Sequence, residues 1–234
     1  MEILKLYGYA KSTGTWRAAT VLYEAKVPFE FVVVDVMHGE HKSPAYLEKQ
    51  PFGQIPYIDD NGFILYESRA ICRYIAAKYP ESNLIPTDPK KNALFEQAAS
   101  SEYANFETIA EGIITEVWGK RTMGLKEDQA VIDAKTLALD AKLNAYNAIL
   151  GKTKYLAGDE ITLADLFHLP HAPIIEEHAK TDIMVRKPNV ARSSLQPIPA
   201  FQKFPPAVGL HVIYAPGGTK TSSRARPGGR SRTG

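Results

Sequence analysis

The sequence is short of cysteine, of long apolar runs and of excess charge, and each shortage excludes a class of protein. Cys72 is the only cysteine among 234 residues, so no internal disulfide can form and a reducing compartment fits. No apolar run reaches the roughly 18 residues of a membrane span, and no basic leader precedes an apolar stretch. We therefore expect a cytoplasmic protein that does not associate with membranes.

Charge is nearly balanced overall but unevenly distributed. The chain carries 28 basic and 26 acidic residues, and six of the basic residues but no acidic one fall in 193–234. This leaves 22 basic against 26 acidic residues, a net charge of −4, for the first 192. Residues 193–234 also hold six prolines and six glycines, a composition typical of disordered chain. We expect a divergent, largely disordered tail there and no nucleic-acid partner. Within it, Leu210–Tyr214 has the apolar residues of an extended segment that can pack on the protein, and disorder is expected from about residue 215.

The hydrophobic pattern predicts an α+β protein of two domains. Residues 1–82 should form the first domain and residues 90–192 an all-helical second domain. A short linker at 83–89 should join them. A strand–helix–strand unit at the start implies a parallel strand pair with a right-handed crossover. The predicted elements of the first domain are strand Ile3–Tyr7, helix Thr15–Lys26, strand Phe29–Val34, an irregular stretch Asp35–Tyr46, a hairpin at 57–66 and helix Ser68–Tyr79.

Helical patterns fill the second domain. One long amphipathic helix should run from Asn92 to about Lys120, and another from Glu127 to Leu150, with Gly151 at its C′ position. Thr162 and Asp165 have the spacing of a capping box, which predicts the start of a third helix.

The stretch from Gln50 to Ile71 organises the first domain. It predicts a turn, a hairpin around an Asp-Asn-Gly signal, and a helix for which Ser68 is the candidate N-cap. Pro56 heads a strand, which suits an edge position or a cis bend and leaves the backbone of Ile55 free to pair with an extended ligand. The helix start at Ser68 offers donors to an anion, and Glu67 offers a carboxylate to an amine.

These residues carry a resemblance to a known family. Pro-Phe-Gly-Gln-Ile-Pro, Glu-Ser-Arg-Ala-Ile and Tyr-Ile-Ala resemble, in sequence and spacing, the glutathione-binding core of cytosolic glutathione transferases. The resemblance covers residues 1–192. It implies a thioredoxin-like (β-α-β-α-β-β-α) domain followed by an all-α domain, and a homodimer formed through the helices that begin at Ser68 and Asn92. It also implies glutathione as co-substrate with no resident cofactor.

The first loop, Gly8 to Arg17, is similar to that of the phi class, the plant and fungal type. A serine of that loop activates the glutathione thiol, and the matching residue is Ser12. A serine in this place is also a natural helix cap. Thr13 is the nearest competing hydroxyl, and Tyr7 stands where other classes carry a catalytic tyrosine, although its strand position favours a place in the core.

Charged residues around the hairpin match the ends of glutathione, which has two carboxylates and one ammonium. The resemblance assigns one carboxylate to His41 and Lys42, which alone would be read as a solvated turn. Ser68 would hold the other carboxylate and Glu67 the ammonium. The middle of the peptide falls to two further residues, Gln54 and the backbone of Ile55.

The resemblance implies conjugation of glutathione to small hydrophobic electrophiles, together with some hydroperoxide reduction. The alternative is a non-catalytic glutathione- or ligand-binding scaffold, because fold does not imply activity. The electrophile pocket should lie between the domains, although each candidate for its lining is also a plausible core residue. These candidates are Tyr103, Phe106, Ile113 and Trp118.

Several further features carry less chemistry. Cys72 lies on an apolar helix face and is expected to be a core residue. His168 and His171 flank Pro170, which breaks regular helix spacing, so we expect no metal site. The family's closing helix is missing after Arg192. Without that closing helix, the helix that begins at Leu163 should expose apolar surface. The apolar residues that cluster there are Leu166, Phe167 and Leu169.

Overall fold

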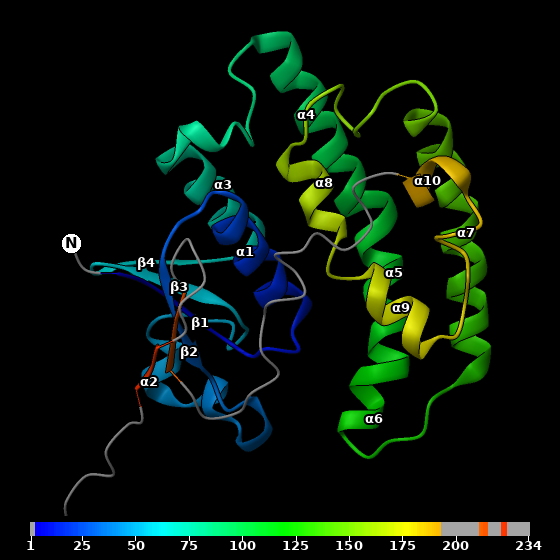
Figure 1. The fold of residues 1–234 in the computed structure, drawn as a ribbon. Coiled ribbons are helices and arrows are strands. Elements are labelled where there is room, and N and C mark those ends of the chain that lie inside the picture. The colour runs from blue at the N-terminus through cyan, green and yellow to red at the C-terminus, as the bar shows by residue number, and fades with distance from the viewer. Residues whose placement is uncertain (1–2, 193–210, 215–220, 224–234) are drawn as a thin grey trace, which may run out of the picture.

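The computed structural model describes residues 3–192, 211–214 and 221–223. A mixed β-sheet with helices on both faces forms the N-terminal part, and a set of helices packs beside it (Figure 1). This confirms the predicted α+β fold. The first part ends with α3 (Ser68–Lys78), and the second begins with α4 (Pro89–Glu102). The segment between these helices contains a short 3₁₀ turn at Pro80–Ser82.

The sheet has the strand order β4-β3-β1-β2-β5-β6. Strands β1 and β2 are parallel and joined by α1 (Thr13–Glu24), as the strand–helix–strand pattern predicts, and β3 pairs antiparallel with both β1 and β4. The N-terminal strands are β1 (Leu4–Gly8), β2 (Phe29–Val33), β3 (Tyr57–Asp60) and β4 (Phe63–Tyr66).

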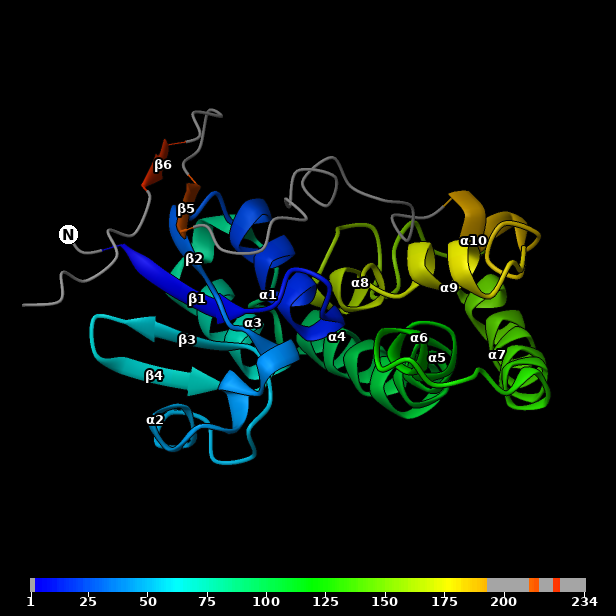
Figure 2. The same ribbon diagram turned by 90° about the horizontal axis from the view of Figure 1, so that it is seen from below.

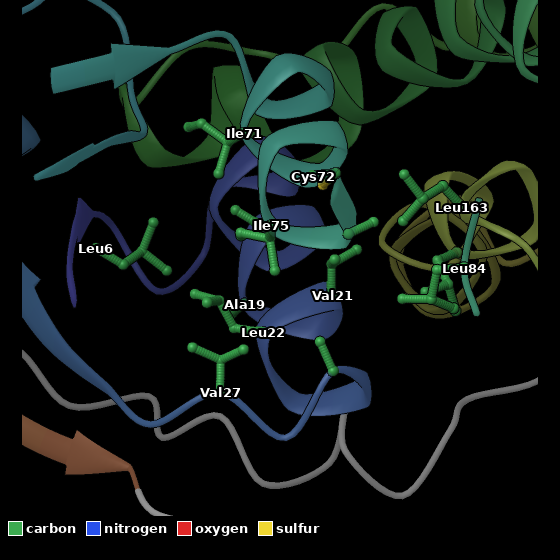
Figure 3. Close-up of a cluster of buried hydrophobic side chains, with 14 of the residues drawn as sticks. Leu6, Ala19, Val21, Leu22, Val27, Ile71, Cys72, Ile75, Leu84 and Leu163 are labelled. Atoms are coloured by element: carbon green, nitrogen blue, oxygen red, sulfur yellow. The ribbon is translucent and has the colours of Figure 1, made fainter. Parts of the chain in front are cut away.

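Alternation along β1 sends its side chains into two different clusters. Leu4 and Leu6 face α1 and α3, in a core that these helices fill with apolar side chains (Figure 3). Tyr7 faces the other way, toward Tyr46 of the short helix α2 (Pro44–Leu47). Figure 2 shows α1 and α3 between the sheet and the helical domain.

The stretch between β2 and β3 is more regular than its composition predicts. It contains two 3₁₀ turns, Val36–His38 and Glu40–Lys42, followed by α2. The hydroxyl of Ser43 caps α2 by accepting from the backbone N–H of Tyr46 at 3.3 Å. These local caps explain how a polar segment keeps a defined path.

The predicted long helix of the second domain is present and starts at Pro89. It runs through α4, α5 and α6 without a break, but two π-turns, Tyr103–Glu107 and Thr115–Gly119, interrupt its α-helical hydrogen bonding. Each π-turn shifts the register of the residues that follow it. The remaining helices are α5 (Thr108–Ile114), α6 (Lys120–Thr122), α7 (Gln129–Leu150), α8 (Leu163–His168), α9 (Ala172–His178) and α10 (Pro188–Arg192).

The end of α7 corrects one detail of the sequence prediction. Gly151 is the C-cap of that helix and has a right-handed conformation, with φ −78°. Gly151 therefore closes the helix as predicted but one position earlier, as the C-cap and not at C′, through a backbone bond from its N–H to the carbonyl of Asn147.

Helix α8 begins with the predicted capping box. The carboxylate of Asp165 accepts from the backbone N–H of Thr162 at 2.9 Å and from its hydroxyl at 3.1 Å. It also accepts from the backbone N–H of Leu156 at 2.9 Å, so one buried side chain holds the loop and the helix start together.

The expected exposure of the α8 cluster is wrong. Leu166 and Phe167 are fully buried and Leu169 is 1% exposed, because α8 packs into the same core as α1 and α3. Leu84 and Leu163 extend that core across the domain boundary (Figure 3). The two domains therefore share a continuous apolar interface.

Two short strands lie within the region predicted to be largely disordered. Strand β5 (His211–Tyr214) pairs antiparallel with β2, and β6 (Thr221–Ser223) pairs with β5. Strand β5 agrees with the extended segment expected at Leu210–Tyr214, since β2 leaves an edge to which a strand can add. Strand β6 differs from the disorder expected from about residue 215, because it pairs with β5 in turn. The rest of the predicted tail lies outside the described residues. Within the described residues, no helix combines the length and apolarity needed to cross a membrane.

Candidate active site

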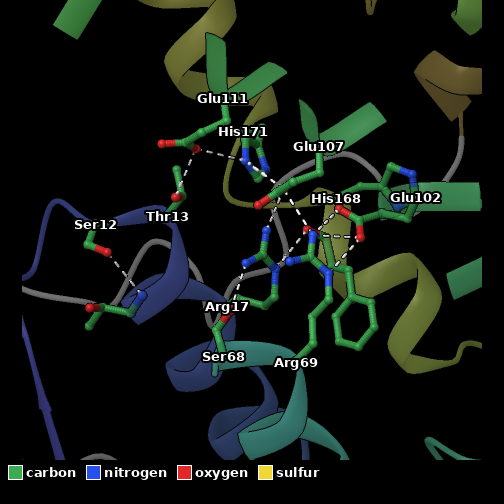
Figure 4. Close-up of polar contacts among 12 residues, drawn as sticks. Ser12, Thr13, Arg17, Ser68, Arg69, Glu102, Glu107, Glu111, His168 and His171 are labelled. Carbon is green, nitrogen blue, oxygen red and sulfur yellow. Dashed lines mark hydrogen bonds and ion pairs between the residues drawn. The ribbon is translucent and has the colours of Figure 1, made fainter. Parts of the chain in front are cut away.

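The loop after β1 places Ser12 at the start of α1. Ser12 has an extended backbone, and its Oγ accepts from the backbone N–H of Thr15 at 3.4 Å, so it is the N-cap (Figure 4). This cap starts α1 two residues before the predicted position. Because capping uses a lone pair of Oγ, the hydroxyl hydrogen of Ser12 stays available to a ligand.

Thr13, the competing hydroxyl, is engaged elsewhere. Its Oγ1 donates to a carboxylate oxygen of Glu111, on α5, at 3.2 Å. The third candidate, Tyr7, stacks on Tyr57 with ring centroids 4.4 Å apart, and burial raises its pKa. Tyr7 is therefore a packing residue beneath α2, as its strand position indicates.

Gly14 allows three parts of the site to meet. A Cβ at this position would lie 3.2 Å from the Pro56 ring and 3.4 Å from the carbonyl oxygen of Ile55. It would also lie 3.7 Å from the Cβ of Ser68. The bond before Pro56 is cis, as one of the two predicted possibilities requires, and β3 is an internal strand. The first loop, the Pro56 bend and the start of α3 therefore converge.

His41 and Lys42 lie against the turn at Gly53. A Cβ on Gly53 would meet Lys42 at 2.8 Å and the carbonyl oxygen of His41 at 2.9 Å, and Lys42 donates to the carbonyl of Phe52 at 3.3 Å. Burial, followed by the charge of Lys42, lowers the pKa of His41. Its Nδ1 is buried and has no hydrogen-bond partner within the described part of the chain.

The start of α3 differs from the prediction. Ser68 is the first helical residue, and Glu67 occupies the cap position with a left-handed φ of 69° and no side-chain capping bond. Such a conformation is uncommon for a residue with a side chain and is concentrated at functional sites. The carboxylate of Glu67 therefore remains exposed at the site, and the hydroxyl of Ser68 accepts from Arg17 at 2.9 Å.

Sequence reasoning missed Arg17, which is 1% exposed and links the two domains (Figure 4). Besides its bond to Ser68, it donates to Glu107 at 2.8 Å and to the carbonyl of Phe167 at 3.3 Å. Glu107 ends the first π-turn. A single arginine in an amphipathic helix gives no sequence signal of partners that lie 51 to 150 residues away.

Arg69 and Glu102 form a second buried pair beside the first. The guanidinium of Arg69 donates to both carboxylate oxygens of Glu102 at 2.7–2.9 Å, and it contacts Glu107 at 3.0 Å. Such bidentate contacts fix the relative orientation of the two side chains and also pair their charges. They anchor the start of α3 to the long helix.

His171 completes this cluster and is fully buried. Its Nε2 lies 3.0 Å from Glu107 and 3.4 Å from Glu111. Burial opposes the charged form of His171, but its contacts with the two carboxylates outweigh burial and raise its pKa. Burial likewise opposes ionisation of Glu107, but His171, Arg17 and Arg69 outweigh it and hold the pKa of that carboxyl far below its usual range.

Glu107, Glu111 and His171 also have the donor types of a metal site. One ligand atom from each lies within 4.8 Å of the others. Arg17 and Arg69, however, place guanidinium groups 2.8 and 3.0 Å from Glu107, where they compete with any cation. The cluster is therefore better suited to holding the long helix against α1.

Two of the four expected pocket residues are buried. Phe106 and Ile113 are fully enclosed in the core of the helical domain, so a ligand does not reach them in this structure. Tyr103 is 59% exposed and lies under the guanidinium of Arg69. Trp118 is half-buried at the edge of the helical core. The π-turns shift the faces of the helix, which a regular 3.6-residue pattern does not anticipate.

Two further side chains near the site, Trp16 and Cys72, have packing roles. The indole of Trp16 donates to the carbonyl of Ala10 and packs against the helical core, so it ties the first loop to the second domain. Cys72, by contrast, is fully buried, and burial raises the pKa of its thiol to about 12. The structure thus confirms Cys72 as a core residue.

Known proteins similar to the chain match both of its domains. Residues 2–77 match the family model described as glutathione S-transferase, N-terminal domain, and residues 105–183 match that of the C-terminal domain. Glutathione S-transferase PM239X14 of Arabidopsis thaliana is 44% identical over 207 residues, which are 85% of this chain and 94% of that protein. Glutathione S-transferase hmp2 of Hypomyces subiculosus is 44% identical and covers 81% of this chain and 91% of its own length.

Solved structures are similar over the same region. Glutathione transferase F7 of Populus trichocarpa superimposes with a TM-score of 0.82 at 37% identity, covering 86% of this chain and 97% of its own. Glutathione S-transferase I of maize, in complex with an atrazine glutathione conjugate, gives 0.78 at 34% identity, with 87% and 96% covered.

Proposed function

Because the chain belongs to the glutathione S-transferase family, in its plant and fungal phi-class form, and is an enzyme that conjugates glutathione, we propose that Ser12 activates the thiol. The observation that carries this proposal is the N-cap geometry of Ser12. Its oxygen accepts from Thr15, and its hydrogen is left to donate to a sulfur anion. Capping and catalysis are therefore compatible roles of one hydroxyl.

The free energy of one hydrogen bond is sufficient for this task. A free thiol has a pKa of about 8.5, so little thiolate is present at neutral pH. A hydrogen bond to a charged group contributes about 1.5–3 kcal/mol, which lowers the thiol pKa by about one to two units. The N-terminus of α1 adds a favourable dipole, and no general base is required. Thr13 suits this role less, because its hydrogen is donated to Glu111.

The charged ends of glutathione find partners around this hydroxyl. In our proposal, Lys42 supplies the positive charge for one carboxylate and His41, whose pKa is lowered, supplies a neutral hydrogen-bonding group. Ser68 and the free N–H groups at the start of α3 hold the other carboxylate. The exposed carboxylate of Glu67 holds the ammonium.

The middle of glutathione then lies along the bend before β3. Gln54 and the backbone of Ile55 pair with the extended peptide, as the position of the Pro56 bend allows. Tyr46 and Gln50 support this loop, since the hydroxyl of Tyr46 donates to the carbonyl of Gln54 at 2.8 Å and Gln50 accepts from its N–H at 3.2 Å.

Small hydrophobic electrophiles are the second substrate in this proposal, with glutathione-dependent reduction of hydroperoxides as a further reaction of the same thiolate. The half-buried rings of Trp16 and Trp118 lie at the edge of the helical core and suit apolar ligands.

The solitary buried cysteine suits a reducing compartment, so we assign the protein to the cytoplasm, which cell fractionation checks.

A conjugation assay tests both the reaction and the absence of a metal. We expect the purified protein to consume glutathione with an activated aryl halide at a rate that a chelator does not change. The reason is that the thiolate is stabilised by Ser12 and the helix dipole, while Glu107 is already paired with Arg17 and Arg69. Loss of activity with chelator and its return with a divalent cation would assign Glu107, Glu111 and His171 as a metal site. An inactive protein that still binds glutathione would favour the scaffold alternative.

A homodimer is the expected assembly, formed through α3 and α4. Leu94 on α4 and Tyr103 just after it are 51% and 59% exposed, and a second copy packed on this helix would bury both. We expect sedimentation to give twice the 25.9 kDa mass of one chain. Leu94→Glu should produce monomers, whereas Leu137→Glu, at a 73% exposed position on α7, should not. A wild-type monomer would contradict the proposal.

A further inference from the structure

The catalytic loop is held from the opposite domain through Thr13. The hydroxyl of Thr13, the first residue of α1, donates to the carboxylate of Glu111 across 98 positions of sequence. At 3.2 Å this bond is longer than the roughly 2.7–2.8 Å common for O–H···O bonds, so its strength comes from the charge of the acceptor. In Figure 4, Ser12 and Thr13 lie at the start of α1, and Glu111 reaches toward Thr13 from the long helix.

Glu111 is itself fixed by a buried partner. Its carboxylate lies 3.4 Å from Nε2 of His171, while the Glu111 side chain as a whole is 47% exposed. His171 is fully enclosed, contacts Glu107 at 3.0 Å and meets the ring of Phe106 edge-on at 5.7 Å. The acceptor for Thr13 therefore has a second neighbour in the helical domain.

The backbone at Ser12 is held by local bonds, from its N–H to the carbonyl of Tyr9 and from the N–H of Trp16 to its carbonyl, each 2.9 Å. The side-chain cap of Ser12 is longer. Its bond to the N–H of Thr15 measures 3.4 Å, whereas such bonds are commonly about 2.9–3.0 Å. Thr13 follows Ser12 directly, so a restraint on Thr13 limits where the Ser12 hydroxyl lies. Positioning at a reactive atom matters, because small misplacements there lower rates severely.

From these contacts we infer that Glu111 and Thr13 form a cross-domain positioning pair that holds the hydroxyl of Ser12 where it meets the glutathione sulfur. The inference rests on the proposed role of Ser12 and deepens it. Glu111 and Thr13 act through the loop and make no contact with the reacting sulfur. Loop placement thereby depends on the second domain, whose helix carries Glu111.

A double-mutant cycle tests this pair. Thr13→Val removes the donor but keeps the shape, and Glu111→Ala removes the acceptor. We expect each change to lower kcat by about threefold to tenfold with little change in the KM for glutathione. The kcat of the double mutant should equal that of the less active single mutant. The pH profile of kcat/KM should shift to higher pH in all three, because the thiolate loses part of its stabilisation.

Conservative variants separate position from charge. Thr13→Ser keeps the donor and Glu111→Gln keeps an acceptor without the charge, so both should restore most of the rate and the wild-type pH profile. Asp133→Ala removes an exposed carboxylate on α7 and is the matched control. If the charge of Glu111 alone mattered, Glu111→Gln would behave like Glu111→Ala, and Thr13→Val would have no effect.

Three outcomes would overturn the inference. Fully additive losses would show that the two residues act independently. An unchanged pH profile with a lower melting temperature would reduce the contact to domain packing. A rise in rate in Glu111→Ala, together with a severe loss in Thr13→Val, would make Thr13 the catalytic hydroxyl and so contradict the role of Ser12 instead.

Discussion

Conjugation at neutral pH should fall tenfold or more when Ser12 is replaced by alanine. A tenfold loss corresponds to about 1.4 kcal/mol, the lower end of the free energy of one hydrogen bond to an anion. The KM for glutathione should change less, because the charged ends of the peptide are held at His41, Lys42, Glu67 and Ser68. The measurement is kcat and KM for glutathione at neutral pH and again at a pH above the pKa of the free thiol. At the higher pH the loss of rate in Ser12→Ala should shrink.

Thr13→Ala provides the comparison for this prediction. Thr13 donates to Glu111, so its loss should cost less than the loss of Ser12. Near-full activity in Ser12→Ala together with loss of activity in Thr13→Ala would shift the assignment by one residue. Because Ser12 also caps α1, thermal unfolding of each variant separates lost activity from lost folding.

The second large effect concerns stability and Asp165. Its carboxylate is 1% exposed and accepts from three donors, two on Thr162 and one on Leu156. Asp165→Ala leaves buried donors without a partner, and each such group costs about 1–3 kcal/mol. We expect Asp165→Ala to lower the free energy of unfolding by roughly 3 kcal/mol or more, and Thr162→Ala by about 1 kcal/mol as a lost cap does.

Urea unfolding measures both losses and their coupling. The double mutant should lose little more than Asp165→Ala alone, because the two side chains share one motif. Asp159→Ala removes an exposed carboxylate from the preceding loop and is the matched control, with an expected loss close to zero. Equal and fully additive losses at 162 and 165 would contradict the capping box.

Local sequence signals predicted the parts of the site that are built locally. The bend before Pro56, for which an edge position was the alternative, the hairpin and the capping box at Thr162 each depend on residues within a few positions of one another, where backbone chemistry decides. The predicted N-cap of α3 was wrong by one residue. Glu67 holds that position in a left-handed conformation, which the sequence does not indicate for a glutamate.

Long-range contacts were beyond the reach of such signals. Arg17 finds its partners at Ser68, Glu107 and Phe167, and only the packing of two domains brings these residues together. The burial of Phe106 likewise follows from the register of a helix with π-turns, which its amphipathic pattern does not reveal. These charged contacts therefore carry no local sequence signal, whereas Ser12 stands in a loop motif that does.

The most direct test of thiol activation by Ser12 is a pH titration of glutathione bound to the enzyme, followed by the ultraviolet absorbance of its thiolate. In the wild-type protein the midpoint should lie about one to two units below the value of about 8.5 for a free thiol. In Ser12→Ala it should return toward that free value while glutathione remains bound. The same lowered midpoint in both proteins would contradict the account, because the thiolate would then be stabilised by something other than Ser12.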